Sequence, residues 1–368
     1  MTAWTVIFYL FVSCTAIQLF YWLKVFGALA FKQIPEAGAT PAQPVSVIIC
    51  AHNELDNLKV LIPALRQQEY ANFQVLVALD RSTDNSLTWL QQQNWERLNI
   101  LDFKEIPDKV NGKKYALLQA IQAADHPHLL LTDADCYPRS NQWIALMAAG
   151  LQANNELVLG FSPYEKRPGL LNTFIRYETL LTGIQYLSRA LQGDPYMGVG
   201  RNLAYTKEFF NNTHQLKPYL RVPGGDDDLL VNHFARGERT GICIKPAAHM
   251  ISRPKSSLKD YLIQKKRHLA VGKHYKYYHK LVLGIFSLTH IIFWSSLVSL
   301  LVTTTHLALV LVLFLIRQIT LSVIVSRSAK QLSHSQSLSS LVFLDFLFGV
   351  YYLYTGLVAL TSKKVNWH

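Results

Sequence analysis

The sequence predicts a doubly wound, mostly parallel α/β sheet with transmembrane helices on both sides of it in the chain. Between residues 45 and 256, short apolar runs alternate with helical patterns, which is typical of parallel strands joined by crossover helices. Apolar segments long enough to cross a bilayer lie before and after this region. Hydrophobic residues make up 50% of the chain and charged residues only 16%, as in membrane proteins.

The N-terminal segment is apolar from residue 4 to residue 31, with Lys24 as its only charge. It exceeds the length of a signal-peptide core, and no basic stretch precedes it, so residues 1–31 are predicted to be an uncleaved transmembrane anchor. Residues 32–44, rich in Pro and Ala, are a predicted linker. Strands are expected at residues 45–51, 73–79, 98–103 and 128–132, with others at 157–161 and 240–244, and helices at 54–68, 87–94 and 114–124.

Two later helical segments are expected near the membrane. Residues 168–191 are amphipathic and suit either the domain core or the membrane interface. Residues 257–280 are strongly basic, as a helix among lipid headgroups or a solvated helix would be. The C-terminal region, residues 281–368, is predicted to hold about three membrane helices, at 281–302, 307–325 and 338–360.

Charge gives a partial account of topology and location. The net charge of +12 fits a nucleic-acid binder or a protein against an anionic leaflet, and the apolar segments favour the leaflet. We therefore expect no nucleic-acid partner and an integral protein of the inner or plasma membrane, in contact with its lipids and with a cytoplasmic sheet domain. Four full spans would place Lys363 and Lys364 outside, against the positive-inside tendency, so one segment is expected to be interfacial or re-entrant.

The predicted fourth strand ends in two carboxylates, Asp133 and Asp135. Ligands of open α/β sheets bind at the carboxyl ends of the strands. Two carboxylates crowded there repel each other unless a cation lies between them, and oxygen ligands suit Mg²⁺ or Mn²⁺, which in turn suit a diphosphate. Alone, the same residues also fit an ordinary Asx-rich turn.

Four further polar features follow strands or open helices in this region. Each alone has a structural explanation, such as a helix cap, a surface lysine or an acidic first helical turn. Together, and in this order, they predict one binding site. They are Asn53 and Glu54 after the first strand, Asp80 to Asp84 after the second, Lys113 at a helix start, where it can meet a phosphate, and Asp226, Asp227 and Asp228 after a glycine pair.

This series of motifs resembles that of membrane-bound family 2 glycosyltransferases, over nearly the whole chain. The resemblance implies a GT-A fold between an N-terminal helix and a C-terminal membrane region. The matching stretches are Val47 to Glu54, Leu79 to Asp84, Gly112-Lys113 with Ala116-Leu117, Asp133 with Asp135, Gly225-Asp226-Asp227, and Gln264 to Arg267. Gly198 to Asn202 resembles the glycine-and-Asn stretch near the acceptor, so Gly200, Asn202 and His268 are expected on the acceptor side.

The resemblance implies an inverting transfer from a nucleotide-sugar, for which we expect a UDP-linked hexose or N-acetylhexosamine. Asp135, helped by Asp133, would hold Mg²⁺ or Mn²⁺, and Asp227 would be the general base, with Asp226 and Asp228 as rivals. Gln264 and Arg267 would stabilise the diphosphate. The other donor-binding residues implied are Asn53, Glu54, Asp80 and Lys113.

Two departures from the family pattern shape the expected reaction. Leu79 replaces the first Asp of its motif, which leaves Asp80 and Glu54 to hold the nucleobase and ribose. His268 replaces the Trp typical of processive polysaccharide synthases, which favours a single transfer to a lipid-linked or other membrane-associated acceptor. A processive synthase and a nucleotidyltransferase, which would release pyrophosphate, remain the alternatives; a transporter or scaffold would leave the acidic motifs unexplained.

Overall fold

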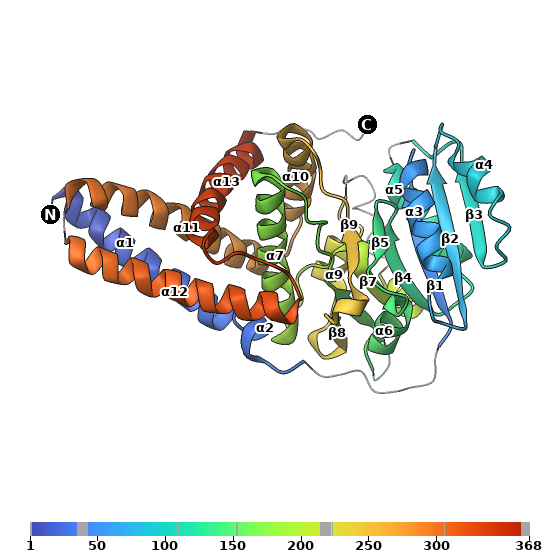
Figure 1. Cartoon of the computed structure of the whole chain (residues 1–368), viewed down its shortest axis with the longest axis horizontal. Coiled ribbons are helices and arrows are strands. Elements are labelled where there is room, and N and C mark those ends of the chain that lie inside the picture. Colours follow the sequence, from blue (N-terminus) through green and yellow to red (C-terminus); the bar gives the residue numbers. More distant parts are fainter. Residues whose placement is uncertain are drawn as a thin grey trace.

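The computed structural model describes residues 2–34, 43–108, 110–151, 154–213, 222, 224–304 and 306–361. Most of the predicted linker, residues 35–42, lies outside this part of the chain, as do Lys363 and Lys364. The described chain has an α/β domain at one end of its long axis and long helices at the other (Figure 1). Helices α7 and α10 lie between the two.

The central sheet has seven strands in the order β3-β2-β1-β4-β7-β6-β8. The four strands predicted before residue 133 are parallel neighbours, and β7 runs antiparallel to both β4 and β6. The predicted strands at 157–161 and 240–244 are β6 and β8, which pair in parallel. The strand bounds are β1 Val45–Ala51, β2 Phe73–Asp80, β3 Leu98–Phe103, β4 His128–Asp133, β6 Leu157–Gly160, β7 Leu203–Thr206 and β8 Thr240–Cys243, and a separate pair is formed by β5 Cys136–Pro138 and β9 Met250–Ser252.

Both faces of the sheet are buried, because helices cover each side. The strand residues of β1, β2 and β4 divide between two apolar cores, one on each face. This explains the nearly continuous apolar runs in the sequence. The helices of the domain are α3 Leu55–Arg66, α4 Ser86–Gln91, α5 Gly112–Ala123, α6 Trp143–Gly150, α8 Lys207–Asn211 and α9 Asp228–Phe234.

Helix α7, Leu170–Leu191, is the amphipathic segment that suited either the core or the interface, and the structure places it on the core. It also contacts the membrane-length helices. The Ser188 hydroxyl donates to the carbonyl of Phe26 at 2.6 Å and accepts from the N–H of Leu29 at 3.1 Å. This helix therefore lies between the α/β domain and the helical region and contacts both.

The basic segment 257–280 is not one helix. Helix α10 runs from Leu258 to Gly272, and the next helix, α11 Tyr277–Thr303, begins four residues before the predicted boundary. The reason is a tertiary contact: the Asn232 side chain accepts the N–H of Lys276 at 2.7 Å and donates to the Tyr196 carbonyl at 2.8 Å. These bonds hold the first turn of α11 on the α/β domain.

Four helices in the described chain are long and apolar enough to cross a membrane. The first is α1 Ala3–Phe20, which a π-helical turn at Tyr21–Val25 continues. The other three are α11, α12 Leu307–Gln331 and α13 Leu341–Thr361. The short α2 Ala28–Phe31 follows the first. Helices α1, α11 and α12 run along the long axis, whereas α13 crosses that direction beside α7 and α10 (Figure 1). Helix α13 thus differs in direction from the other three.

A buried ion pair joins these helices. Arg317 on α12 and Asp345 on α13 are both fully buried and form a salt bridge. Arg317 also donates to Gln18 on α1 at 3.2 Å, and the His290 ring on α11 contacts the Asp345 carbonyl at 3.0 Å. The network holds α13 against the other helices, and it explains the arginine that interrupts the second C-terminal apolar segment.

We predict that Asp345→Asn destabilises the helical region, because it leaves the Arg317 charge buried without its counter-charge. The expected loss is about 3–5 kcal/mol, the usual cost of removing one partner of a buried pair. It is measured as a lower thermal unfolding midpoint of the detergent-purified protein. The double variant Arg317→Met/Asp345→Leu should recover much of the loss.

Ile319→Ala is the matched control, since Ile319 lies on α12, the helix of Arg317, and is 62% exposed. An Asp345→Asn protein as stable as this control would contradict the structural role of the pair.

Candidate active site

A cavity of about 590 Å³ opens where the carboxyl ends of β1, β2 and β4 face α7 and α10. Its position at the strand ends is the one at which open α/β sheets bind ligands. The cavity brings together most of the predicted site residues, from segments far apart in the sequence. The predicted residues in its lining are Glu54, Asp80, Lys113, Asp133, Asp135, Gly200, Asp226, Asp227, Asp228, Gln264, Arg267 and His268.

Lys113 links the two acidic motifs. Its ammonium lies 2.8 Å from Asp133 and 3.6 Å from Asp226. Asn111 caps α5 by accepting the N–H of Lys114 at 3.2 Å, which places Lys113 in the first turn of that helix. Burial opposes the charge of Lys113, but the surrounding carboxylates outweigh it and raise its pKa well above the ordinary value.

Asp133 and Asp135 have opposite electrostatic surroundings. Burial disfavours the charged form of Asp133, yet Lys113 outweighs burial and lowers the pKa of this carboxyl. Burial and the neighbouring Asp133 raise the pKa of Asp135. Among the described residues, the Asp135 side chain accepts only a long contact, 3.4 Å, from the Cys136 thiol. Asp135 therefore has oxygen lone pairs available to a ligand.

These two carboxylates fit a divalent cation that shares its shell with a ligand. The described residues contain no group of three or more His, Cys, Asp or Glu side chains arranged to hold a metal. Mg²⁺ in phosphate-handling sites is commonly held by only one or two carboxylates plus substrate phosphates and water. The incompletely bonded Asp135 beside the ionised Asp133 matches that requirement.

The loops after β1 and β2 are fastened to each other. The Asn53 side-chain carbonyl accepts the N–H groups of Thr83 at 2.7 Å and Asp84 at 3.2 Å. Asn53 has φ +55°, a left-handed conformation that Asn tolerates. Asn53 is thus a scaffold for these loops and is not part of the cavity lining, unlike Glu54 and Asp80.

Close packing keeps Asp80 next to the start of α5. Its carboxylate is bonded by the Arg81 guanidinium at 2.7 Å. A Cβ atom at Gly112 would lie 2.1 Å from the Asp80 carboxylate and 2.5 Å from Arg81, so a larger residue there would push this ion pair out of its place. This is the physical reason for the glycine of the Gly112-Lys113 motif.

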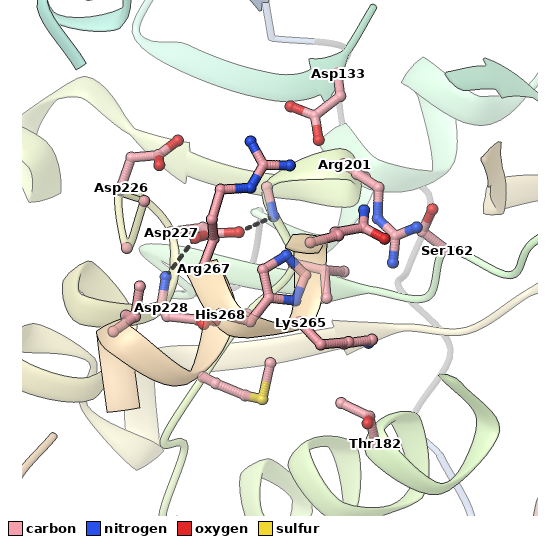
Figure 2. Close-up of a pocket in the computed structure, with 18 of the residues that line it drawn as sticks. Asp133, Ser162, Thr182, Arg201, Asp226, Asp227, Asp228, Lys265, Arg267 and His268 are labelled. Carbon is pink, nitrogen blue, oxygen red and sulfur yellow. Dashed lines mark hydrogen bonds between the residues drawn. The ribbon is translucent and has the colours of Figure 1, made fainter. Parts of the chain in front are cut away.

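The acidic triplet follows a sharp turn at Gly224 and Gly225, where φ is +81° and +77°. Asp227 caps α9: one oxygen accepts the N–H of Asp228 at 2.8 Å, and the other accepts the N–H of Gly200 at 2.5 Å (Figure 2). Burial and the adjacent Asp226 raise the pKa of Asp227 to about 6, although Lys113 and the backbone N–H groups lower it.

The other two members of the triplet differ from Asp227. The carboxylate of Asp226 faces Lys113. Burial, followed by the charge of Asp227, raises the pKa of Asp228 well above the ordinary value. Of the two carboxyls with raised pKa, Asp227 is the one whose pKa remains close to neutral pH.

Helix α10 brings its predicted motif to the same cavity. Gln264, Arg267 and His268 all line it, and Arg267 and His268 lie beside Asp227 in the view of Figure 2. The Gln264 amide is 3.5 Å from the Tyr164 hydroxyl. Burial, together with the neighbouring cations, lowers the pKa of His268 well below its ordinary value, so this ring is neutral.

The glycine-and-Asn stretch divides between two roles. Gly200 lines the cavity and holds Asp227, as described above. Asn202 is fully buried and absent from the cavity lining: it accepts from the Trp143 indole at 2.9 Å and donates to the carbonyls of Phe161 and Ala248, each at 2.9 Å. Its side chain therefore hydrogen-bonds inside the domain and does not face the cavity.

Sequence reasoning did not single out Arg201, which lines the cavity between these two residues. Its guanidinium lies over the Tyr164 ring, 4.6 Å from the ring centre, and Nη1 is buried without a hydrogen-bond partner. Its charge acts on both Asp133 and Asp135. Its place in the Gly198 to Asn202 stretch was the only sequence signal.

Comparison with known proteins identifies the domain. Residues 46–213 match the family model described as Glycosyl transferase family 2. The match runs from β1 to the residues just after α8, so it includes the Asp133 and Asp135 motif and ends before the acidic triplet and α10. No curated protein matches the chain.

One solved structure shares the fold over nearly the whole chain. A mannosyltransferase from Pyrobaculum calidifontis, PcManGT, solved with GDP-Man and Mn²⁺, is 16% identical with a TM-score of 0.64 over 99% of this chain and 100% of that one. Residues 1–349 of S. aureus TarS, solved with UDP-GlcNAc, are 13% identical with a TM-score of 0.43 over 85% and 91% of the two chains. Residues 46–213 thus match a glycosyltransferase family, and the chain combines a GT-A fold with four helices of membrane-spanning length; the protein is a glycosyltransferase.

Proposed function

We propose that the protein is an inverting glycosyltransferase that moves a sugar from a nucleotide-sugar to a hydroxyl of a lipid-linked or membrane-associated acceptor. The observation that carries this proposal is the place of Asp227. This carboxylate, with a pKa of about 6, lines the same cavity as the Asp133 and Asp135 pair. A base with a pKa just below neutral is ionised at pH 7 and still accepts a proton readily.

Asp227 is the best base of the triplet. Its two backbone hydrogen bonds fix its orientation, and each carboxylate oxygen keeps a further lone pair for the acceptor proton. Burial and the charge of Asp227 raise the pKa of Asp228 well above its ordinary value, which favours its uncharged form and makes it the poorer base. Asp226 faces Lys113, which holds it as a counter-charge. The acceptor oxygen, as Asp227 takes its proton, attacks the anomeric carbon from the side opposite the diphosphate, which inverts its configuration.

The departing diphosphate needs positive charge around it. Lys113, Arg201 and Arg267 line the cavity and offer it. Asp135 and Asp133 would hold Mg²⁺ or Mn²⁺, which when bound supplies further positive charge to neutralise the leaving group. PcManGT, of the same fold, was solved with Mn²⁺. Glu54 and Asp80, at the β1 and β2 ends, are suited to hold the nucleoside, and we expect UDP as the nucleotide.

The membrane position supports a membrane-borne acceptor. Helix α7 lines the cavity and also packs against the apolar helices, so the cavity reaches the boundary of the membrane region. We place the catalytic domain on the cytoplasmic side of the cell membrane, where nucleotide-sugars are available. A processive synthase would make polymer from donor alone, and a nucleotidyltransferase would release pyrophosphate rather than nucleoside diphosphate.

We predict that Asp135→Ala abolishes donor turnover while the protein stays folded, because one of its two metal-holding carboxylates is lost. Removing divalent ions with a chelator should have the same effect. Adding Mg²⁺ or Mn²⁺ should then restore donor turnover by the parent protein but not by the variant. The assay measures release of nucleoside diphosphate from a panel of UDP- and GDP-sugars with membrane lipid extract. Full turnover in excess chelator would rule out the metal role.

We predict that Asp227→Asn binds nucleotide-sugar normally but transfers sugar roughly 10²–10⁴-fold more slowly, the usual contribution of a general base. The amide is nearly isosteric and cannot take the proton. Asp228→Asn is the matched control and should keep far more activity, since burial and the charge of Asp227 already favour the uncharged form of Asp228. If Asp228→Asn or Asp226→Asn loses transfer in this way and Asp227→Asn does not, the base has been assigned to the wrong residue.

The pKa of about 6 for Asp227 also predicts a pH profile. Because only the ionised carboxylate accepts the proton, kcat/KM should be level above pH 7 and fall roughly tenfold per pH unit well below 6. Initial rates between pH 5 and pH 8 test this. A rate that stays level down to pH 5 would show that no group with this pKa acts as the base.

A further inference from the structure

The cavity continues past Asp227 to a wall of polar side chains on α7, α10 and α13. Glu178, Thr182 and Tyr186 are spaced four residues apart on α7, so they share one helix face, and all three line the cavity. Lys265 of α10 and Tyr351 of α13 complete these five residues, which we term the α7 wall. In Figure 2, Thr182 and Asp133 lie on opposite sides of Asp227.

The α7 wall contains a buried ion pair that the transfer chemistry does not use. The Lys265 ammonium lies 2.6 Å from Glu178 Oε2, and each side chain is only 10% exposed. Within the part of the chain that the structure describes, the other Glu178 oxygen receives only a long contact, 3.4 Å, from the Thr182 hydroxyl. It therefore has a lone pair that a ligand hydroxyl can use.

The charges of this wall cancel. Lys265 is neutralised by Glu178, and the nearby acidic triplet adds negative charge. A lipid phosphate bound here would meet a compensated lysine and, nearby, the ionised carboxylate of Asp227. An uncharged hydroxylated group would instead find a carboxylate oxygen, an ammonium and hydroxyls that hydrogen-bond to it without adding charge.

Exposed apolar side chains lie on the two helices that carry most of the wall. Leu170, at the start of α7, is 57% exposed, and Leu258 and Ile263 of α10 are 59% and 51% exposed. Helix α7 also packs against the apolar helices α12 and α13. A molecule with a polar head in the cavity can thus keep its hydrocarbon against apolar protein or lipid.

We propose that the α7 wall is the acceptor subsite, and that it binds the uncharged, hydroxylated head group of a membrane lipid rather than a lipid phosphate. This inference rests on the proposed function. In the step it serves, the acceptor oxygen forms a bond to the anomeric carbon, the bond to the nucleoside diphosphate breaks with its electron pair, and the hydroxyl proton passes to Asp227. A lipid phosphate is already ionised and has no need of that base.

The test compares acceptors in phosphatidylcholine vesicles that contain diacylglycerol, monohexosyl-diacylglycerol or undecaprenyl phosphate. The full-length protein is incubated with each kind of vesicle and a panel of UDP- and GDP-sugars, and the lipid products are identified by mass spectrometry. Transfer to a neutral lipid, and none to undecaprenyl phosphate, is expected. Transfer to the phosphate alone would overturn the acceptor assignment and leave glycosyl transfer intact. If no donor is consumed, even by hydrolysis, both the acceptor assignment and the proposed glycosyl transfer are contradicted.

Variants then locate the subsite. Thr182→Val should raise the KM for the neutral lipid about tenfold, the effect of one lost hydrogen bond, without changing the KM for the donor. Thr173→Val is the matched control: Thr173 is on the same helix but outside the cavity lining, and its hydroxyl bonds only the Gly169 carbonyl, at 3.0 Å.

Glu178→Gln removes the counter-charge of Lys265. It should weaken use of the neutral lipid and make undecaprenyl phosphate a stronger competitive inhibitor, an effect that a merely structural role would not produce. Thermal unfolding midpoints verify that each variant is folded. Unchanged acceptor KM in both folded variants would show that the acceptor binds elsewhere.

Discussion

The ion pairs of Lys113 hold the active site together. This lysine, in the first turn of α5, bridges Asp133 at the end of β4 and Asp226 in the turn before α9, segments separated by more than ninety residues of sequence. Without a cation between them, carboxylates from these segments would repel one another in a partly buried cavity. The remaining features of the site depend on this arrangement: Asp227 reaches its position beside Gly200 because its neighbour Asp226 is held at Lys113.

The same site illustrates how one set of like charges is given different functions. Lys113 favours the ionised form of Asp133. Burial and the charge of Asp133 disfavour the ionised form of Asp135. Asp227 has a pKa near 6, and Asp228 is pushed well above its ordinary value. Environments that separate the pKa values of neighbouring carboxyls are typical of acid–base sites. Here they give neighbouring carboxyls of one cavity different tendencies to ionise.

Much of this arrangement could be predicted from sequence, because it depends on strong local patterns. Apolar runs ending in Asp80 or Asp133 mark strands that end at the cavity, and the long apolar segments mark the membrane helices. The short strands β5, β7 and β9 and the break at Gly272 were not predicted, since three or four residues have no distinct period and the break depends on Asn232. Arg201, Asn202 and the Glu178–Lys265 pair acquire their roles only through contacts between distant segments, which no local pattern specifies.

The central claim is an inverting transfer with Asp227 as the base, and the anomeric configuration of the product tests it most directly. With an α-linked nucleotide-sugar as donor and a lipid acceptor, the one-bond C–H coupling of the anomeric carbon in the purified product distinguishes the two outcomes. A β-linked product, formed together with free nucleoside diphosphate, is the result we predict. An α-linked product would require a different mechanism, in which Asp227 is not the base of a single displacement.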